Sequence, residues 1–152
     1  MALYQVMQGA EGKSASTGKR SDWMTTEPSK SAVRILVAED DDAMRIFLLN
    51  ALSRAGHDVN AMPSGESAVT CASLGSYDLL LTDVEMPGMD GVDLARLMMA
   101  DSPKLRVMFV TGYAEKALQA TDVISRGARV LSKPFALSDL VRQVQTMIAA
   151  PV

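Results

Sequence analysis

The feature that most constrains the fold of this 152-residue chain is an alternation, repeated five times, of short apolar runs with longer segments of helical period. The predicted strands are residues 34–38, 58–61, 77–82, 106–110 and 129–131. The predicted helices are one that Asp42 caps and Gly56 ends, then residues 65–73, 92–101, 114–125 and 138–150, the last with Ser138 as its N-cap. This order is typical of βα units around a parallel sheet, which predicts an α/β fold.

The predicted topology brings the carboxyl ends of the strands together. Parallel strands joined by right-handed crossovers all end at the same edge of their sheet. In open α/β sheets this edge is where ligands bind. The residues that directly follow the strands are therefore the candidates for a functional site.

Those residues carry a distinctive set of side chains. Glu39 and Asp40 follow the first strand, Asp83 the third, Thr111 the fourth, and Lys133 comes shortly after the fifth. Several carboxylates brought together repel one another, and a divalent cation relieves that repulsion. An all-oxygen set of ligands suits Mg²⁺. The sequence thus predicts an acidic Mg²⁺ site with one lysine and one hydroxyl beside it.

The acids of this predicted site have different alternative explanations. Asp41 and Asp42 are explained by the start of a helix, where acidic side chains complement the helix dipole. Asp83 is not, because it ends the apolar run Leu79, Leu80, Leu81, and a carboxylate there is costly unless it is paired or metal-bound.

Five segments of the chain together resemble the receiver domain of two-component response regulators. They are ILVAED at 35–40, YDLLLTD at 77–83, MPGMDG at 86–91, TG at 111–112 and KPF at 133–135. The resemblance covers nearly all of residues 33–150. It implies the CheY-like, flavodoxin-like fold, a doubly wound parallel (βα)5 sheet with strand order 2-1-3-4-5.

The resemblance also implies roles for the acidic residues. Asp83 would accept a phosphoryl group from a phosphohistidine. Asp40 and Asp83 would ligate Mg²⁺ directly, Glu39 through a bound water, and Glu85 through its backbone carbonyl.

Two further residues are expected to contact the phosphoryl group. Phosphoryl transfer spreads charge over three oxygens, so cations and hydrogen-bond donors aimed at those oxygens lower the barrier. Lys133 supplies the cation and Thr111 the donor, beside Asp83 as the nucleophile. The bond from Lys133 to Pro134 resembles the cis peptide of the family.

The sequence departs from the family pattern at two positions. Val130 stands where many receivers have an aromatic ring that moves with the threonine, and we expect Tyr113 to act as the substitute. Glu85 is placed so that its side chain could face the phosphoryl group and alter its lifetime.

We therefore expect a signalling protein rather than an enzyme: a single-domain response regulator in a phosphorelay, because only seventeen residues follow Phe135. Its donor would be a histidine kinase or histidine phosphotransferase. Within the family it most resembles the CpdR type, which implies a cell-cycle adaptor that engages the ClpX unfoldase of the ClpXP protease. A CheY-like or shuttle receiver is the alternative. A Mg²⁺-dependent aspartyl-phosphate hydrolase is more remote, because Glu85 stands where those enzymes need a second aspartate.

Composition sets the remaining expectations. A single cysteine, Cys71, allows no internal disulfide and favours the cytoplasm, and no apolar run is long enough to span a membrane. The net charge of −3 disfavours nucleic acid as a partner. Residues 1–31 are polar and aperiodic, so we expect a disordered extension before a receiver domain at residues 32–152, with Met24 as a possible second translation start.

Overall fold

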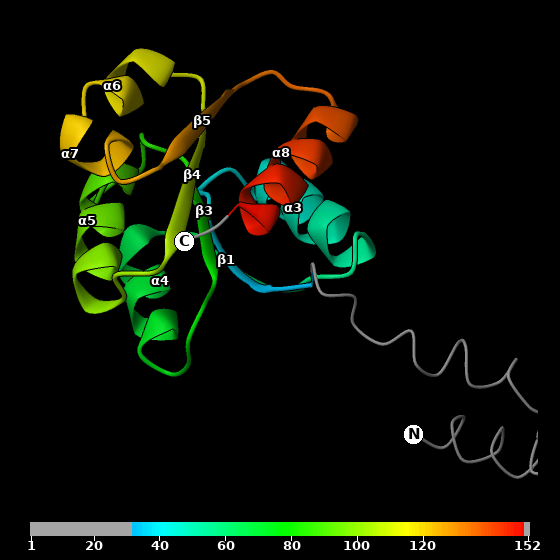
Figure 1. The fold of residues 1–152 in the computed structure, drawn as a ribbon, viewed down its shortest axis with the longest axis horizontal. Helices are drawn as coiled ribbons and strands as arrows, with labels where there is room; N and C mark the ends of the chain where they lie inside the picture. The colour runs from blue at the N-terminus through cyan, green and yellow to red at the C-terminus, as the bar shows by residue number, and fades with distance from the viewer. Residues whose placement is uncertain (1–31, 151–152) are drawn as a thin grey trace, which may run out of the picture. The chain divides into compact units, whose positions relative to one another are not determined.

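The computed structural model describes residues 32–150, which form a three-layer α/β domain (Figure 1). Five parallel strands make one sheet in the order β2-β1-β3-β4-β5. The strands are β1 (Arg34–Ala38), β2 (Asp58–Met62), β3 (Leu79–Thr82), β4 (Arg106–Thr111) and β5 (Arg129–Ser132). The predicted fold class and strand order are confirmed, although β3 begins two residues later than predicted. The predicted extension at 1–31 lies outside the described residues.

Helices cover both faces of the sheet (Figure 1). They are α3 (Asp42–Arg54), α4 (Gly65–Ala72), α5 (Gly91–Asp101), α6 (Ala114–Leu118), α7 (Thr121–Ile124) and α8 (Leu137–Ala149). Alternate residues of each strand point to opposite faces, so the central strands supply two separate cores. Ile35 and Val37 pack with α3 and α8, whereas Leu36 and Ala38 pack with α4 and α5. This burial on both sides explains why the central strands are continuous apolar runs.

Two helix N-caps differ from the predicted ones. Asp41, rather than Asp42, is the N-cap of α3, and its carboxylate accepts a hydrogen bond from the Met44 amide at 2.8 Å. Ala136, rather than Ser138, is the N-cap of α8, without any side-chain cap. Gly56 does follow the end of α3, with a φ of 101° that favours glycine.

The predicted helix at 114–125 is two short helices, α6 and α7. Ala120, between them, has a φ of −81° and a ψ of 69°, which interrupts the helix. It is buried with Ala117 and Val123 in the core under α5. Asp122 in α7 binds Arg96 in α5 through two hydrogen bonds, at 2.8 and 3.0 Å. Tertiary contacts therefore set this break, since no glycine or proline marks it.

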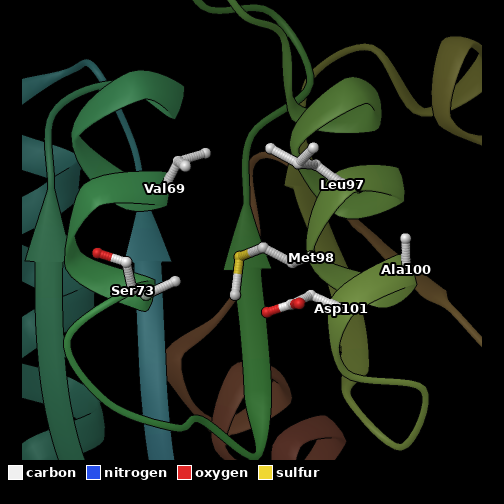
Figure 2. A pocket seen from close by; sticks show the side chains of 7 residues that line it. Val69, Ser73, Leu97, Met98, Ala100 and Asp101 are labelled. Carbon is white, nitrogen blue, oxygen red and sulfur yellow. The ribbon is translucent and has the colours of Figure 1, made fainter.

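A shallow groove separates α4 from α5 (Figure 2). Val69 and Leu97 face it from the two helices, and Met98 lies at its floor with only 8% of its surface exposed. Met86 and Met99 are also buried in the core. These methionines therefore mainly fill the core. No helix of the described region is long and apolar enough to cross a membrane.

Candidate functional site: an acidic cluster with one lysine

The register of the sheet brings the predicted site residues to one edge. Ala38, the last residue of β1, pairs with Thr82, the last of β3, so Glu39 and Asp83 follow neighbouring strand ends. The Asp83 amide donates to the Ala38 carbonyl at 3.1 Å, and the Glu39 amide donates to the Met62 carbonyl at 3.0 Å. The acids thus lie on backbone that the sheet itself holds in place.

Three carboxylates form a cluster at this edge. One oxygen from each of Glu39, Asp40 and Asp83 lies within 4.8 Å of the others. Glu39 and Asp83 are buried and Asp40 is exposed, so the cluster opens to solvent on one side. Closely spaced carboxylate oxygens with solvent access are a donor set that fits Mg²⁺, which usually keeps several of its own waters. The prediction of an acidic cluster is confirmed; its binding of a metal stays a prediction.

Lys133 joins the cluster from the loop after β5. Its Nζ lies 2.8 Å from Glu39 Oε1 and 3.1 Å from Asp83 Oδ2. Its backbone amide donates to the Thr111 carbonyl at 2.9 Å, and the bond to Pro134 is cis, as the resemblance implied. The lysine therefore bridges two buried carboxylates that lie 94 and 50 residues away in the sequence.

Burial and hydrogen bonding set the protonation of this pair. Burial raises the pKa of the Glu39 carboxyl above its usual range, against the opposing hydrogen bond from Lys133. Burial also acts to lower the pKa of Lys133, but the hydrogen bonds to Glu39 and Asp83 outweigh it and the pKa is raised. The lysine consequently stays charged at neutral pH.

Both oxygens of Glu39 are already bound. Oε1 accepts from Lys133, and Oε2 accepts from the Asp41 amide at 3.1 Å. Each oxygen accepts one hydrogen bond and keeps a second lone pair. The role of Glu39 toward a metal, through a bound water, stays a prediction.

Thr111 lies at the same edge, fully buried at the end of β4. Its Oγ1 accepts a hydrogen bond from the Tyr113 amide at 2.9 Å, which leaves the hydroxyl hydrogen available to a ligand. Among the described residues it has no hydrogen bond to Asp83. The structure thus brings Glu39, Asp40, Asp83 and Lys133 into direct proximity, and Thr111 beside them.

Glu85 is not part of the carboxylate cluster. Its side chain forms an ion pair with Lys116 of α6, and the Lys116 ammonium lies 5.2 Å from the centre of the Tyr113 ring. The carboxylate of Glu85 is therefore held toward α6 by a positive charge. Its predicted contribution to a metal site is through the backbone carbonyl, and that stays a prediction.

Sequence reasoning missed two residues that shape the site. Arg45 of α3 donates to the Glu39 carbonyl at 3.0 Å and to Asp42 at 2.7 Å, and the i, i+3 spacing of Asp42 and Arg45 was the available signal. Gly91 was recognised only as part of a motif. A Cβ at this position would lie 1.8 Å from the Asp83 carbonyl oxygen, so only glycine permits this packing.

A parallel α/β sheet with a carboxylate cluster and a lysine at its carboxyl edge is the arrangement expected of a receiver domain. The sequence model of the response regulator receiver domain family matches residues 35–145 of this chain. The chain therefore belongs to the response regulator receiver family, which is a signalling family rather than one of classical enzymes.

Two relatives support this family assignment by their sequence identity. The response regulator receiver protein CpdR of Brucella abortus (strain 2308) is 47% identical over 117 residues, which covers 77% of this chain and 98% of that protein. The sensor kinase CckA of the same organism is 35% identical over 125 residues, which covers 81% of this chain but only 13% of the kinase.

Solved structures agree as well. A receiver domain from the hybrid histidine kinase CckA superposes with a TM-score of 0.64 at 32% identity, over 76% of this chain and 98% of that one. The response regulator TrrA of Thermotoga maritima, in complex with Mg²⁺ and beryllium fluoride, superposes with a TM-score of 0.66 at 28% identity, over 75% of this chain and 97% of that one.

The close approach at Gly91 gives a direct test of the site's packing. We expect Gly91→Ala to lower the free energy of unfolding by about 1–3 kcal/mol, because the added methyl meets the Asp83 carbonyl. The control is Gly112→Ala, where a Cβ meets nothing within 4 Å and φ is not positive. Urea denaturation measures both variants. Equal losses of stability would contradict the close approach.

Proposed function

We propose that this protein is a single-domain response regulator that accepts a phosphoryl group on Asp83 from the phosphohistidine of a histidine kinase or histidine phosphotransferase. The observation that carries the proposal is the position of Asp83, whose Oδ2 lies 3.1 Å from the ammonium of Lys133 in a solvent-accessible acidic cluster. The match to CckA, a sensor kinase, supports a phosphorelay.

Mg²⁺ is the proposed cofactor. Asp40 and Asp83 would hold it through carboxylate oxygens, Glu39 through water and Glu85 through its backbone carbonyl. The complex of TrrA with Mg²⁺ and beryllium fluoride supports this assignment. When bound, the ion neutralises negative charge on the carboxylates and on the incoming phosphoryl oxygens.

The proposed transfer assigns each residue a task. A carboxylate oxygen of Asp83 forms a bond to phosphorus while the bond from phosphorus to the donor histidine nitrogen breaks, and that nitrogen keeps the electron pair. The Val84 amide donates to Asp83 Oδ1 at 2.7 Å and so fixes the orientation of the carboxylate. The Lys133 ammonium would stabilise the negative charge that develops on the phosphoryl oxygens, and the Thr111 hydroxyl would donate a hydrogen bond to one of them.

The domain would catalyse only its own phosphorylation and dephosphorylation. Hydrolysis requires water to reach the phosphorus on Asp83. The carboxylate of Glu85, two residues after Asp83, is paired with the ammonium of Lys116. This arrangement counts against the hydrolase alternative, which needs a free general acid two residues after the nucleophile.

The proposed output is a change in the surface formed by α6, β5 and α8. Tyr113 links this surface to the site, because its amide donates to Thr111 Oγ1 while the residue as a whole is 53% exposed. Val130 is half-buried against the core and has no ring to rotate. A hydroxyl that turns toward a phosphoryl group would release the Tyr113 amide and free the ring to move. We therefore propose Tyr113 as the residue that reports phosphorylation.

The 47% identity with CpdR over nearly the whole of that protein supports a CpdR-like output. We propose that the unphosphorylated form engages the ClpX unfoldase as an adaptor in cell-cycle control. A CheY-like output partner or a phosphorelay shuttle is the second candidate, since either would use the same site residues. We also propose a cytoplasmic location, with residues 32–152 as the receiver domain.

Phosphorylation by a small donor tests the acceptor. We expect acetyl phosphate with Mg²⁺ to add the mass of one phosphoryl group to the wild-type chain and none to Asp83→Asn, as measured by intact mass spectrometry. Asp101→Asn, which alters an exposed carboxylate at the end of α5, is the control and should be phosphorylated normally. Phosphorylation of Asp83→Asn at the wild-type rate would contradict the proposal.

Capture of ClpX tests the output. We expect immobilised wild-type protein to retain purified ClpX, and phosphorylation with acetyl phosphate to reduce the retained amount by about tenfold, a shift of about 1.4 kcal/mol. In Tyr113→Ala, phosphorylation should still occur but should no longer reduce ClpX retention. Retention that ignores phosphorylation in the wild type would contradict the adaptor, and discrimination that persists in Tyr113→Ala would exclude Tyr113 as the reporter.

A further inference from the structure

A second charged region lies at the end of the sheet opposite the acidic cluster. Arg106 and Arg129 are the first residues of β4 and β5, and Lys104 and Arg126 lie in the segments just before these strands. All four line one pocket, which the end of α8 closes at Ala150. No carboxylate lines this pocket within the described region.

Within residues 32–150, most lysine and arginine side chains form ion pairs, and the four cations of this pocket do not. Residues 32–150 contain eleven lysine and arginine side chains, of which six form ion pairs with described carboxylates. Four of the other five line the pocket, and the fifth is Arg54 of α3. The described region carries fifteen Asp and Glu side chains, so the shortage of partners is local.

The pocket has a defined shape. Leu105 and Met147, exposed by 6% and 3%, form part of its wall, and Arg106 is half-buried and donates to the Ala150 carbonyl. Lys104, Arg126 and Arg129 are exposed around it. A neighbouring hollow is also lined by Lys104 and Arg106, and by Asp78. The Asp78 carboxylate accepts a hydrogen bond from the Arg34 amide at 2.9 Å and forms no ion pair with Lys104 or Arg106.

We propose that this pocket is a docking site for an acidic peptide segment of a partner protein. Arginine presents donors in a planar fork that matches a carboxylate, and three such side chains surround the pocket. The pocket accepts carboxylate side chains of an extended acidic segment, with their methylene groups against Leu105 and Met147. Such binding would supply the carboxylate partners that the four cations lack within residues 32–150.

Other polyanions fit this surface less well. Single-stranded nucleic acid is held by aromatic side chains that stack on its bases, and the described pocket wall contains none. Membrane surfaces are held by exposed large apolar side chains beside the cations, and none of those in the described region borders the pocket.

The site is separate from the phosphorylation chemistry. The pocket lies where β4 and β5 begin, whereas Asp83 follows the end of β3, and parallel strands keep these ends apart. An acidic segment bound there would leave the site at Asp83 open. The inference does not depend on the proposed function.

Binding of a hexaglutamate peptide to the full chain tests the proposal. We expect ¹⁵N NMR titration to shift the amides of residues 104–106 and 126–129, with the same affinity before and after treatment with acetyl phosphate. The double variant Lys104→Glu with Arg126→Glu should weaken binding by about tenfold or more. The control is Arg54→Glu with Arg142→Glu, which makes the same change in net charge away from the pocket and should weaken binding by less than about twofold.

Three outcomes would overturn the proposal. Equal losses in the two double variants would mean that the peptide responds to net charge alone. Absence of hexaglutamate binding to the wild type would remove the acidic peptide as the ligand. Tighter binding of a six-nucleotide oligothymidylate, or of phosphatidylserine vesicles, that depends on Lys104 and Arg126 would assign the pocket to another class of ligand.

Discussion

The whole site depends on one buried ammonium shared by two buried carboxylates. Lys133 contacts Glu39 at 2.8 Å and Asp83 at 3.1 Å, and the carboxylate side chains are 1% and 10% exposed. Buried charges are costly unless they are paired, so removing the lysine would leave two carboxylates in mutual repulsion. Three carboxylates thus face one ammonium, a formal excess of two negative charges that a divalent cation would neutralise. The same lysine thus stabilises the resting cluster and limits its charge.

The fold supplies the rigidity that this arrangement needs. Glu39 and Asp83 follow the neighbouring strands β1 and β3, whose ends are in register, and the Lys133 amide is bound to the Thr111 carbonyl at the end of β4. Two apolar cores hold the sheet from opposite faces, so the strand ends cannot shift independently. The close approach of Gly91 to the Asp83 carbonyl fixes the loop on the other side. Catalysis of phosphoryl transfer rests largely on such prior positioning.

The fold and the acidic cluster were predictable because each leaves a pattern in the sequence. Apolar runs followed by acids at 39–40 and 83 locate strand ends, and parallel topology brings strand ends together. The break between α6 and α7 was not predictable, because no glycine or proline marks it and the tertiary contacts beside it, such as that of Arg96 with Asp122, join residues 26 apart. The same holds for the ion pair of Glu85 with Lys116, which depends on where α6 lies over the β3–α5 loop. The N-cap of α3 was misplaced because several consecutive acids can cap a helix equally well by pattern.

The two ends of the sheet carry opposite charge, with carboxylates where the strands end and arginines where β4 and β5 begin. The measurement that tests the acidic end most directly is calorimetric titration of Mg²⁺ into the wild type and into Asp40→Asn. We expect one ion per chain in the wild type and an affinity at least about tenfold lower in the variant, which loses a charged ligand at an exposed position. A wild type that binds no Mg²⁺, or an unchanged affinity in Asp40→Asn, would contradict the account.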